Sequence, residues 1–425
     1  MNARERLNMT LNHQEPDKVV VDLGSSVVTG IAAGALSRLR DALGLEKRLV
    51  KVYEPMQLLG EVEEDVREAL GIDVAGVCPN IVNFGYENKD WKPWHLADGT
   101  EVLVGGGFTT TVDEKGDTYI YPQGDLKARP SGMMPKGGWY FDQMVRQEPY
   151  DEDKLDAKAA REDFKDDFGL LKDETLRYME NLSSYYYDNT EYGINLGNFY
   201  ATFGDVAFIP GVGLKVTKGV RSAEDWLVTH YTAPEYIKEV YQMHSEAALK
   251  NLGMLWEAIG KKAQVIQLSG TDFGTQRSEY ISPDMYREFY KPLHKKVNDW
   301  VHSKTTWKTM YHSCGAITNF LDDFVEAGVD IVNPVQCSAA CMDPKWLKET
   351  YGKKLVFWGA GMDTQKILPF GTPEEVHEHV LERLEIFAPG GGFVFNAIHN
   401  IQANVPVQNI ITAFNAVKEY NNRKR

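Results

Sequence analysis

Cysteines and long apolar runs are both scarce in this sequence, and each scarcity excludes a class of protein. The 425 residues include four cysteines, too few and too unevenly spaced for a disulfide scaffold: Cys78, Cys314, Cys337 and Cys341. No stretch reaches the roughly 18 uncharged apolar residues of a membrane span, and residues 1–18 lack the apolar segment of a secretory signal. We therefore expect a cytoplasmic protein with no membrane partner, whose thiols are reduced and either structural or metal-bound.

Positive charge is scarce as well. Lys and Arg total 46 against 61 Asp and Glu, which gives a formal charge of −15 at pH 7. The densest basic stretch, residues 422–425, is typical of a solvated tail, and an acidic protein repels a phosphate backbone. Two glycine triplets, at 105–107 and 390–392, lack the following Lys-Ser/Thr of a phosphate-binding loop. A nucleic-acid partner is therefore not expected.

The second half of the chain alternates short apolar runs with amphipathic helices. The runs are apolar enough to be strands buried on both faces, and they lie at Gln264–Leu268, Lys308–His312, Ile331–Val335, Leu355–Trp358 and Gly392–Asn396. Val19–Gly24 and Asp73–Cys78 are earlier candidates of the same kind. This rhythm predicts an α/β fold in which residues 1–425 form one (β/α)8 TIM barrel, with a doubly wound open sheet as the alternative.

Residues 100–145 differ in composition and are predicted to form a β-rich insertion within the barrel. Threonines and tyrosines flank the turn Asp113–Asp117 inside the segment Glu101–Tyr121, which is the composition of a β-hairpin. In a barrel such an insertion usually decorates the face that carries the site. We expect it to serve as a lid or as a docking surface for a partner.

Polar side chains follow five consecutive predicted strands, and the carboxyl ends of parallel barrel strands meet at one cavity. The sharpest pattern is His312-x-Cys314, because residues two apart in an extended chain point to the same side and can reach one ion. A catalytic zinc ion needs three protein ligands, so the third would come from another strand end, with His399 or Cys337 best placed. The alternative is that Cys314 is a small buried hydrophobe and His312 a hydrogen-bonded core histidine.

Three further residues at the same rim are candidates for catalysis. Asp272, Gln336 and Asp363 each lie just after a predicted strand. The two carboxylates would orient a substrate or a ligand histidine, and the alternative is that they cap the adjacent loops.

Five long segments carry a family resemblance: RERLNMTLNHQEPDKVVVDLG, ISPDMYREFYKPLHKKV, MYHSCGAITNFLDDFVEAGVDIVNPVQ, LVFWGAGMDTQKILPFGTPEEV and GGFVFNAIHNIQANVPVQNI. On these residues the chain resembles the uroporphyrinogen decarboxylase superfamily, whose members are (β/α)8 barrels and include corrinoid-dependent methyltransferases. The resemblance spans nearly the whole chain. It implies the same barrel fold and an enzyme of one of the two branches.

The two branches differ in their site residues. The decarboxylase branch grips the carboxylates of a tetrapyrrole with an arginine-rich N-terminal segment, whereas the corresponding VDLGSSVVTG here has no arginine. The methyltransferase branch resembles this chain better, through a His-x-Cys zinc site that a later cysteine completes. His312 and Cys314 match that pattern, and His399 stands in NAIHNIQANVP where the cysteine would be. Histidine is a competent substitute ligand, with less negative charge than a thiolate.

The resemblance implies a zinc-dependent methyltransferase that moves a methyl group between a small methylated or thiol substrate and a corrinoid. The chain lacks the D-x-H-x-x-G signature of corrinoid-binding domains, so the corrinoid is expected on a partner protein. The alternatives are a tetrapyrrole decarboxylase like uroporphyrinogen decarboxylase, and a barrel that binds corrinoid without turnover. The methyl donor and acceptor and the oligomeric state, a homodimer included, stay open.

Overall fold

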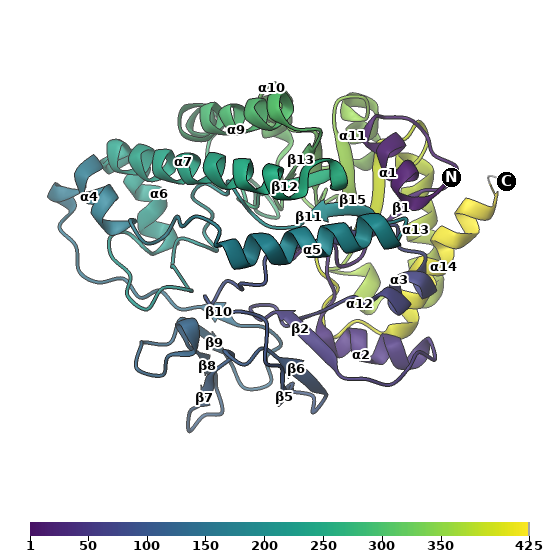
Figure 1. Cartoon of the computed structure of the whole chain (residues 1–425). Helices are drawn as coiled ribbons and strands as arrows, with labels where there is room; N and C mark the ends of the chain where they lie inside the picture. The colour runs from purple at the N-terminus through teal and green to yellow at the C-terminus, as the bar shows by residue number, and fades with distance from the viewer. Residues whose placement is uncertain (424–425) are drawn as a thin grey trace.

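An eight-stranded parallel sheet lies at the centre of the molecule (Figure 1). The computed structural model describes residues 1–423, and the sheet runs in the order β1, β16, β15, β14, β13, β12, β11, β4. The strands are β1 (Val20–Val21), β4 (Val74–Gly76), β11 (Gly193–Leu196), β12 (Val265–Ser269), β13 (Lys308–His312), β14 (Ile331–Asn333), β15 (Val356–Met362) and β16 (Phe393–Ala397). The N–H of Asp73 donates a 2.8 Å hydrogen bond to the carbonyl of Val21, so the two ends of the sheet meet. The predicted (β/α)8 barrel is confirmed, and the open-sheet alternative is wrong.

The N-terminal end of the barrel is closed by the first helix, α1 (Ala3–Leu11). Its Leu7 and Leu11 belong to one buried cluster with strand residues, none of the cluster more than 4% exposed: Val20, Val74, Val265, Met310, Ile331, Val356, Trp358 and Val394. Full burial of an aliphatic side chain contributes about 1.5–3 kcal/mol to the free energy of unfolding. The packing of α1 therefore stabilises this end of the barrel and fills it.

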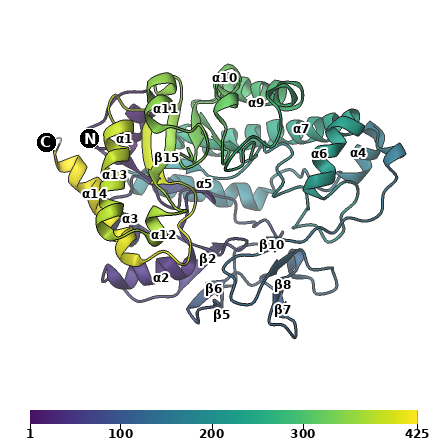
Figure 2. The same cartoon turned by 180° about the vertical axis from the view of Figure 1, so that it is seen from behind.

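Helices follow the strands and surround the sheet, as the reverse view shows (Figure 2). They are α2 (Ala33–Ala42), α3 (Glu64–Leu70), α4 (Ala157–Asp163), α5 (Asp173–Asn189), α6 (Ala223–Thr232), α7 (Pro234–Ile259), α8 (Pro283–Met285), α9 (Lys291–Lys304), α10 (Leu321–Glu326), α11 (Pro344–Tyr351), α12 (Ile367–Phe370), α13 (Pro373–Phe387) and α14 (Val407–Arg423). Thr372 and Glu375 form a reciprocal capping box at the start of α13. Within residues 1–423, none of the helices has the length and hydropathy that crossing a membrane requires.

Two small sheets lie on one side of the barrel, at the bottom of Figure 1. One has the order β3, β2, β6, β5 and the other the order β10, β9, β8, β7. Their strands are β2 (Val50–Glu54), β3 (Leu59–Gly60), β5 (Lys92–His95), β6 (Glu101–Val104), β7 (Thr110–Val112), β8 (Thr118–Ile120), β9 (Gly132–Met134) and β10 (Asp142–Gln143). β7 and β8 pair antiparallel as the predicted hairpin. Because these segments follow the carboxyl ends of β1 and β4, they stand at the barrel face to which site residues belong.

One barrel strand, β11, has no counterpart among the strands predicted from the sequence. Its four residues are all buried, yet they include Gly193 and Asn195, which interrupt the apolar run. A Cβ at Gly193 would overlap the side chain of Leu7 from α1. Close packing of the closing helix thus removes from β11 the apolar signal that marks the other strands.

Candidate metal centre

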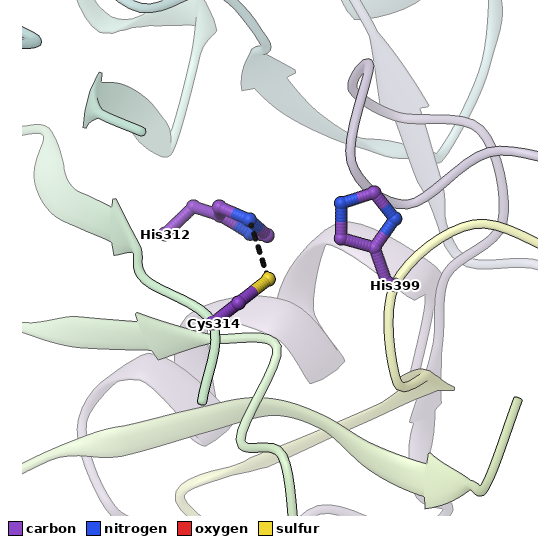
Figure 3. Close-up of side chains that lie close together, drawn as sticks. All are labelled: His312, Cys314 and His399. Atoms are coloured by element: carbon purple, nitrogen blue, oxygen red, sulfur yellow. Dashed lines mark hydrogen bonds between the residues drawn. The ribbon is translucent and has the colours of Figure 1, made fainter. Parts of the chain in front are cut away.

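His312 and Cys314 lie side by side at the carboxyl end of β13 (Figure 3). The Sγ of Cys314 is 3.3 Å from Nε2 of His312, the distance at which a thiol donates a hydrogen bond to an imidazole nitrogen. His312 is buried, with 4% of its surface exposed, and Cys314 is partly buried. The extended backbone at the end of β13 thus turns both side chains toward the same point.

The other nitrogen of His312 is held by Asn333, which lies opposite it in β14. The amide Nδ2 of Asn333 donates to the carbonyl of Trp358 at 2.8 Å, and a carbonyl can only accept. The Oδ1 of Asn333 therefore faces His312 and accepts from its Nδ1–H at 2.6 Å. With the proton fixed on Nδ1, the lone pair of Nε2 points toward Cys314 and is free to bind a metal.

The loop that carries Cys314 is tied to neighbouring strand ends. Its backbone N–H donates to Oδ1 of Asp272 at 2.6 Å, and the next N–H, of Gly315, donates to Oε1 of Gln336 at 2.8 Å. Gly315 has a φ of 85°, and a Cβ there would overlap the backbone of Gly274. Asp272 and Gln336 thus fix the position of the thiol through the backbone.

His399 approaches the pair from the loop after β16 (Figure 3). Its ring centroid is 5.2 Å from that of His312, and one donor atom from each of His312, Cys314 and His399 lies within 4.8 Å of the others. The residue has a φ of 69°, a left-handed conformation that is uncommon outside glycine. The N–H of Asn400 donates to Nδ1 of His399 at 2.8 Å, so the proton of the neutral ring is on Nε2. Before His399 can bind a metal, this hydrogen bond has to break or the ring has to turn, so that a nitrogen lone pair faces the ion.

Burial controls the charge of the three side chains. Removal from water lowers the pKa of His312 to about 4 and that of His399 to about 4, so both imidazoles are neutral at pH 7. Burial, and next the charge of Asp272, raises the pKa of the Cys314 thiol above its usual range. Burial also raises the pKa of Asp272. A divalent cation would reverse the penalty on the thiolate, because it supplies the missing positive charge.

The three grouped residues lie in a segment that matches a known family. Residues 215–420, which include His312, Cys314 and His399, match the model of the family described as uroporphyrinogen decarboxylase (URO-D). Over this segment, just under half of the chain, the protein is similar to that family. A solved structure of a methyltransferase from Methanosarcina mazei shares the fold, with a TM-score of 0.55 and 15% identity over 99% of each chain. No curated protein is significantly similar to the chain in sequence.

Two residues that the sequence offers as candidates at strand ends, Cys337 and Asp363, lie outside the cluster of three. Cys337 is not among the grouped donors of residues 1–423, and the charges that act on its thiol are those of Arg383, Asp343 and Asp363. Its backbone turns away from the strand end, because its N–H donates to the carbonyl of Val335, a residue with a φ of 58°. As third ligand beside His312 and Cys314, the geometry thus favours His399 over Cys337.

The side chain of Asp363 caps the loop in which it lies. Its Oδ1 accepts from the N–H groups of Gln365 at 2.8 Å and Lys366 at 2.7 Å, the capping role that the sequence offered as the alternative. Asp272 also accepts from a backbone N–H, but its carboxylate lies at the cluster, with Oδ1 3.8 Å from Nε2 of His312. The two aspartates are therefore not equivalent.

Sequence reasoning passed over Asn333, which fixes the tautomer of His312. The available signal was its position inside the predicted strand Ile331–Val335, which follows the strand that carries His312 along the chain. It also passed over Asp205, a buried carboxyl whose charge acts on Cys314. Asp205 follows β11, the strand without an apolar signal, so nothing in the local pattern placed it near the site.

Proposed function

We propose that this protein is a cytoplasmic zinc-dependent methyltransferase, which moves a methyl group between a small substrate and a corrinoid carried by a partner protein. The observation that carries the proposal is the meeting of His312, Cys314 and His399, one donor atom from each lying within 4.8 Å of the others. All four cysteines of the chain are free thiols, as metal binding by Cys314 requires.

The donor set fits zinc. Zinc bonds of about 2.3 Å to sulfur and about 2.0 Å to nitrogen put the donors of a tetrahedral site roughly 3.5 Å apart. The 3.3 Å between Sγ of Cys314 and Nε2 of His312 is of that size. One thiolate and two imidazoles also suit this borderline-soft ion better than they suit magnesium or calcium. Three protein ligands leave a position for substrate, as in catalytic rather than structural zinc sites.

Bound zinc would supply Lewis acidity, which stabilises a substrate thiolate or withdraws electrons from a methylated heteroatom. The residues around it would prepare the site for that chemistry. Asn333 keeps the proton of His312 on Nδ1, and Asp272 is placed to accept the proton that Cys314 releases on metal binding. Gln336 holds the backbone of Gly315 and so keeps the loop in place.

The decarboxylase alternative has less support. Binding a tetrapyrrole with several carboxylates calls for cationic partners, and the segment after β1 offers none between residues 22 and 30. That segment instead contains Asp22, which accepts from Nε1 of Trp358 at 2.8 Å and is fully buried. A buried acid at this point opposes the binding of an anionic substrate.

The decisive experiment combines metal analysis with assay of methyl transfer. Untagged protein should contain about one zinc per chain and should transfer methyl groups between methylcobalamin and a small thiol. Cys314→Ser and His312→Ala should lose both zinc and transfer, whereas Cys337→Ser, the matched control, should keep both. Metal-free protein that releases carbon dioxide from a tetrapyrrole would overturn the proposal in favour of the decarboxylase.

A further inference from the structure

A cavity of about 460 Å³ adjoins the metal centre without including its three ligand candidates. Its nearest wall is the loop after β11, which contains Phe199, Thr202 and Asp205. The ring centroid of Phe199 lies 6.4 Å from that of His312. Thr202 Oγ1 accepts from the N–H of Gly270 at 3.1 Å, directly after β12, so the loop is fastened to the barrel rim. Phe199 therefore lines the cavity and also lies beside His312 of the candidate metal centre.

Aromatic side chains supply much of the cavity wall: Phe164, Phe168, Phe199, Phe208, Trp226 and Tyr241. Phe199 and Phe208 meet edge to face with centroids 5.8 Å apart, and Phe164 and Trp226 are 5.5 Å apart. The faces of aromatic rings carry negative potential and attract cations that cannot donate hydrogen bonds. Such walls suit methylated ammonium groups as well as neutral apolar ligands.

The charges of the lining distinguish these two classes of ligand. Three aspartates line the cavity, Asp166, Asp167 and Asp205, and the lining contains no Lys or Arg. Asp167 is neutralised by Arg221, whose Nη1 is 2.6 Å from it. The single histidine of the lining, His244, is neutral because burial lowers its pKa to about 4. The cavity thus has a negative field, which repels anions and attracts cations.

Among the residues that the structure describes, Asp205 is the buried carboxyl of the lining that has no ion pair, whereas Asp166 is exposed to water. Asp205 is 5% exposed, and no ion pair among residues 1–423 includes it. Its hydrogen bonds come from the N–H of Ala207 at 2.8 Å and, more weakly, the hydroxyl of Thr202 at 3.3 Å. Burial, and next the charge of Asp272, raises its pKa to about 7, so a cation beside it would be stabilised by pairing. A neutral ligand would leave this carboxylate unpaired.

We propose that the cavity binds an alkylammonium group, with the aromatic rings around its alkyl substituents and Asp205 as its counter-ion. The substrate is then a small molecule with a cationic end in the cavity and a thiol or methylated heteroatom at the metal end. This reading of the ligand as substrate rests on the proposed function, whereas the binding of the cation does not.

The test compares a cation with its neutral isostere. Choline and 3,3-dimethylbutan-1-ol have the same shape and differ by one charged nitrogen, and each is titrated at pH 8 while the heat of binding is measured by calorimetry. Choline should bind about tenfold or more tightly than the alcohol. Asp205→Asn should reduce choline affinity about tenfold, and Asp188→Asn, which changes an exposed carboxylate on α5, should leave it unchanged.

A second set of variants separates the two proposals. Cys314→Ser removes a metal ligand candidate and should still bind choline, so loss of metal and loss of cation binding are told apart. Phe208→Leu keeps apolar bulk and removes a ring, so it should weaken choline severalfold while sparing the alcohol, and it carries the test if Asp205→Asn fails to fold. Equal affinity for both probes, no binding of either, or indifference to both substitutions would overturn the inference.

Discussion

Single side chains decide whether a metal can bind at the end of β13. The thiol of Cys314 and the imidazole of His312 are the candidate donors, and neighbouring residues set the protonation of His312 and the backbone position of Cys314. Asn333 sets the tautomer of His312, and Asp272 holds the N–H of Cys314. The ligands alone therefore describe only part of the centre.

Asn333→Ala should weaken zinc binding by about 10- to 100-fold, because His312 loses the acceptor that keeps its proton on Nδ1. Competition with a chelating dye measures this affinity. Asn333→Asp keeps an acceptor oxygen and should bind zinc more tightly than the alanine variant. Equal affinity for the two variants would show that the tautomer of His312 does not matter.

The histidine most deeply embedded in the aromatic core, His294, predicts a pH dependence of stability. It is fully buried, and its Nδ1 forms a 3.0 Å hydrogen bond with the hydroxyl of Tyr286. Burial lowers the pKa of His294 to about 3. Above pH 6.5 neither the folded nor the unfolded state protonates it. As the pH falls below 6.5, His294 binds a proton in the unfolded chain but not in the folded protein, so the free energy of unfolding decreases.

His294→Gln should therefore flatten the pH dependence of unfolding between pH 6 and 4.5, by about 1.4 kcal/mol per pH unit. Urea titrations at several pH values give this slope. Phe324→Leu alters the same aromatic cluster without removing a titratable group and should keep the wild-type slope. A wild-type slope in His294→Gln would mean that this imidazole accepts a proton in the fold.

At the scale of elements, β11 shows how packing overrides local pattern. Gly193 begins this strand because α1 brings Leu7 against it, where a Cβ would overlap the leucine. The strand is a full member of the barrel, paired with β4 on one side and β12 on the other. Its hydrogen bonds thus compensate for a sequence that is poor in apolar residues.

Gly193→Ala should destabilise the protein by about 1–3 kcal/mol, since the new methyl group must displace a fully buried leucine. Gly253→Ala in α7 is the matched control. A Cβ there meets nothing closer than 3.9 Å, so the helix should gain up to about 1 kcal/mol. Chemical denaturation of both variants gives the two changes, and a neutral Gly193→Ala would show that α1 can move.

The contrast between strands with and without an apolar run explains which features the sequence predicts. Apolar runs such as β15 and β16 are visible because burial on both faces demands them. The shorter apolar pair Met310 and Tyr311 in β13 places His312 and Cys314 at a strand end. The third ligand was not decided, because His399 and Cys337 both follow strands and only backbone turns separate them. The position of Asp205 could not be predicted, because it follows β11, the strand whose apolar run is interrupted. Contacts between distant segments cannot be read from local periodicity.

Across the whole molecule, the candidate ligands join parts of the chain that lie far apart. His312 and Cys314 lie at the end of β13, while His399 follows β16, three strands further round the barrel. A metal held by all three would tie these loops together and would bind the folded state alone. The fold should therefore gain stability from zinc.

Zinc at about 1,000 times its Kd should add about 4 kcal/mol to the free energy of unfolding and raise the Tm of chelator-treated protein by a few degrees. Differential scanning calorimetry measures the change. The Cys314→Ser variant should show no such rise. A rise of the same size in that variant would place the stabilising ion somewhere else.

The helix α1 closes one end of the barrel. With Leu7 and Leu11 packed among strand residues at one end, a ligand of the buried imidazole and thiol is expected to approach from the opposite rim. On the proposed function, the small substrate and the corrinoid protein would both use that rim. We would then expect the two to bind one after the other, with the substrate first.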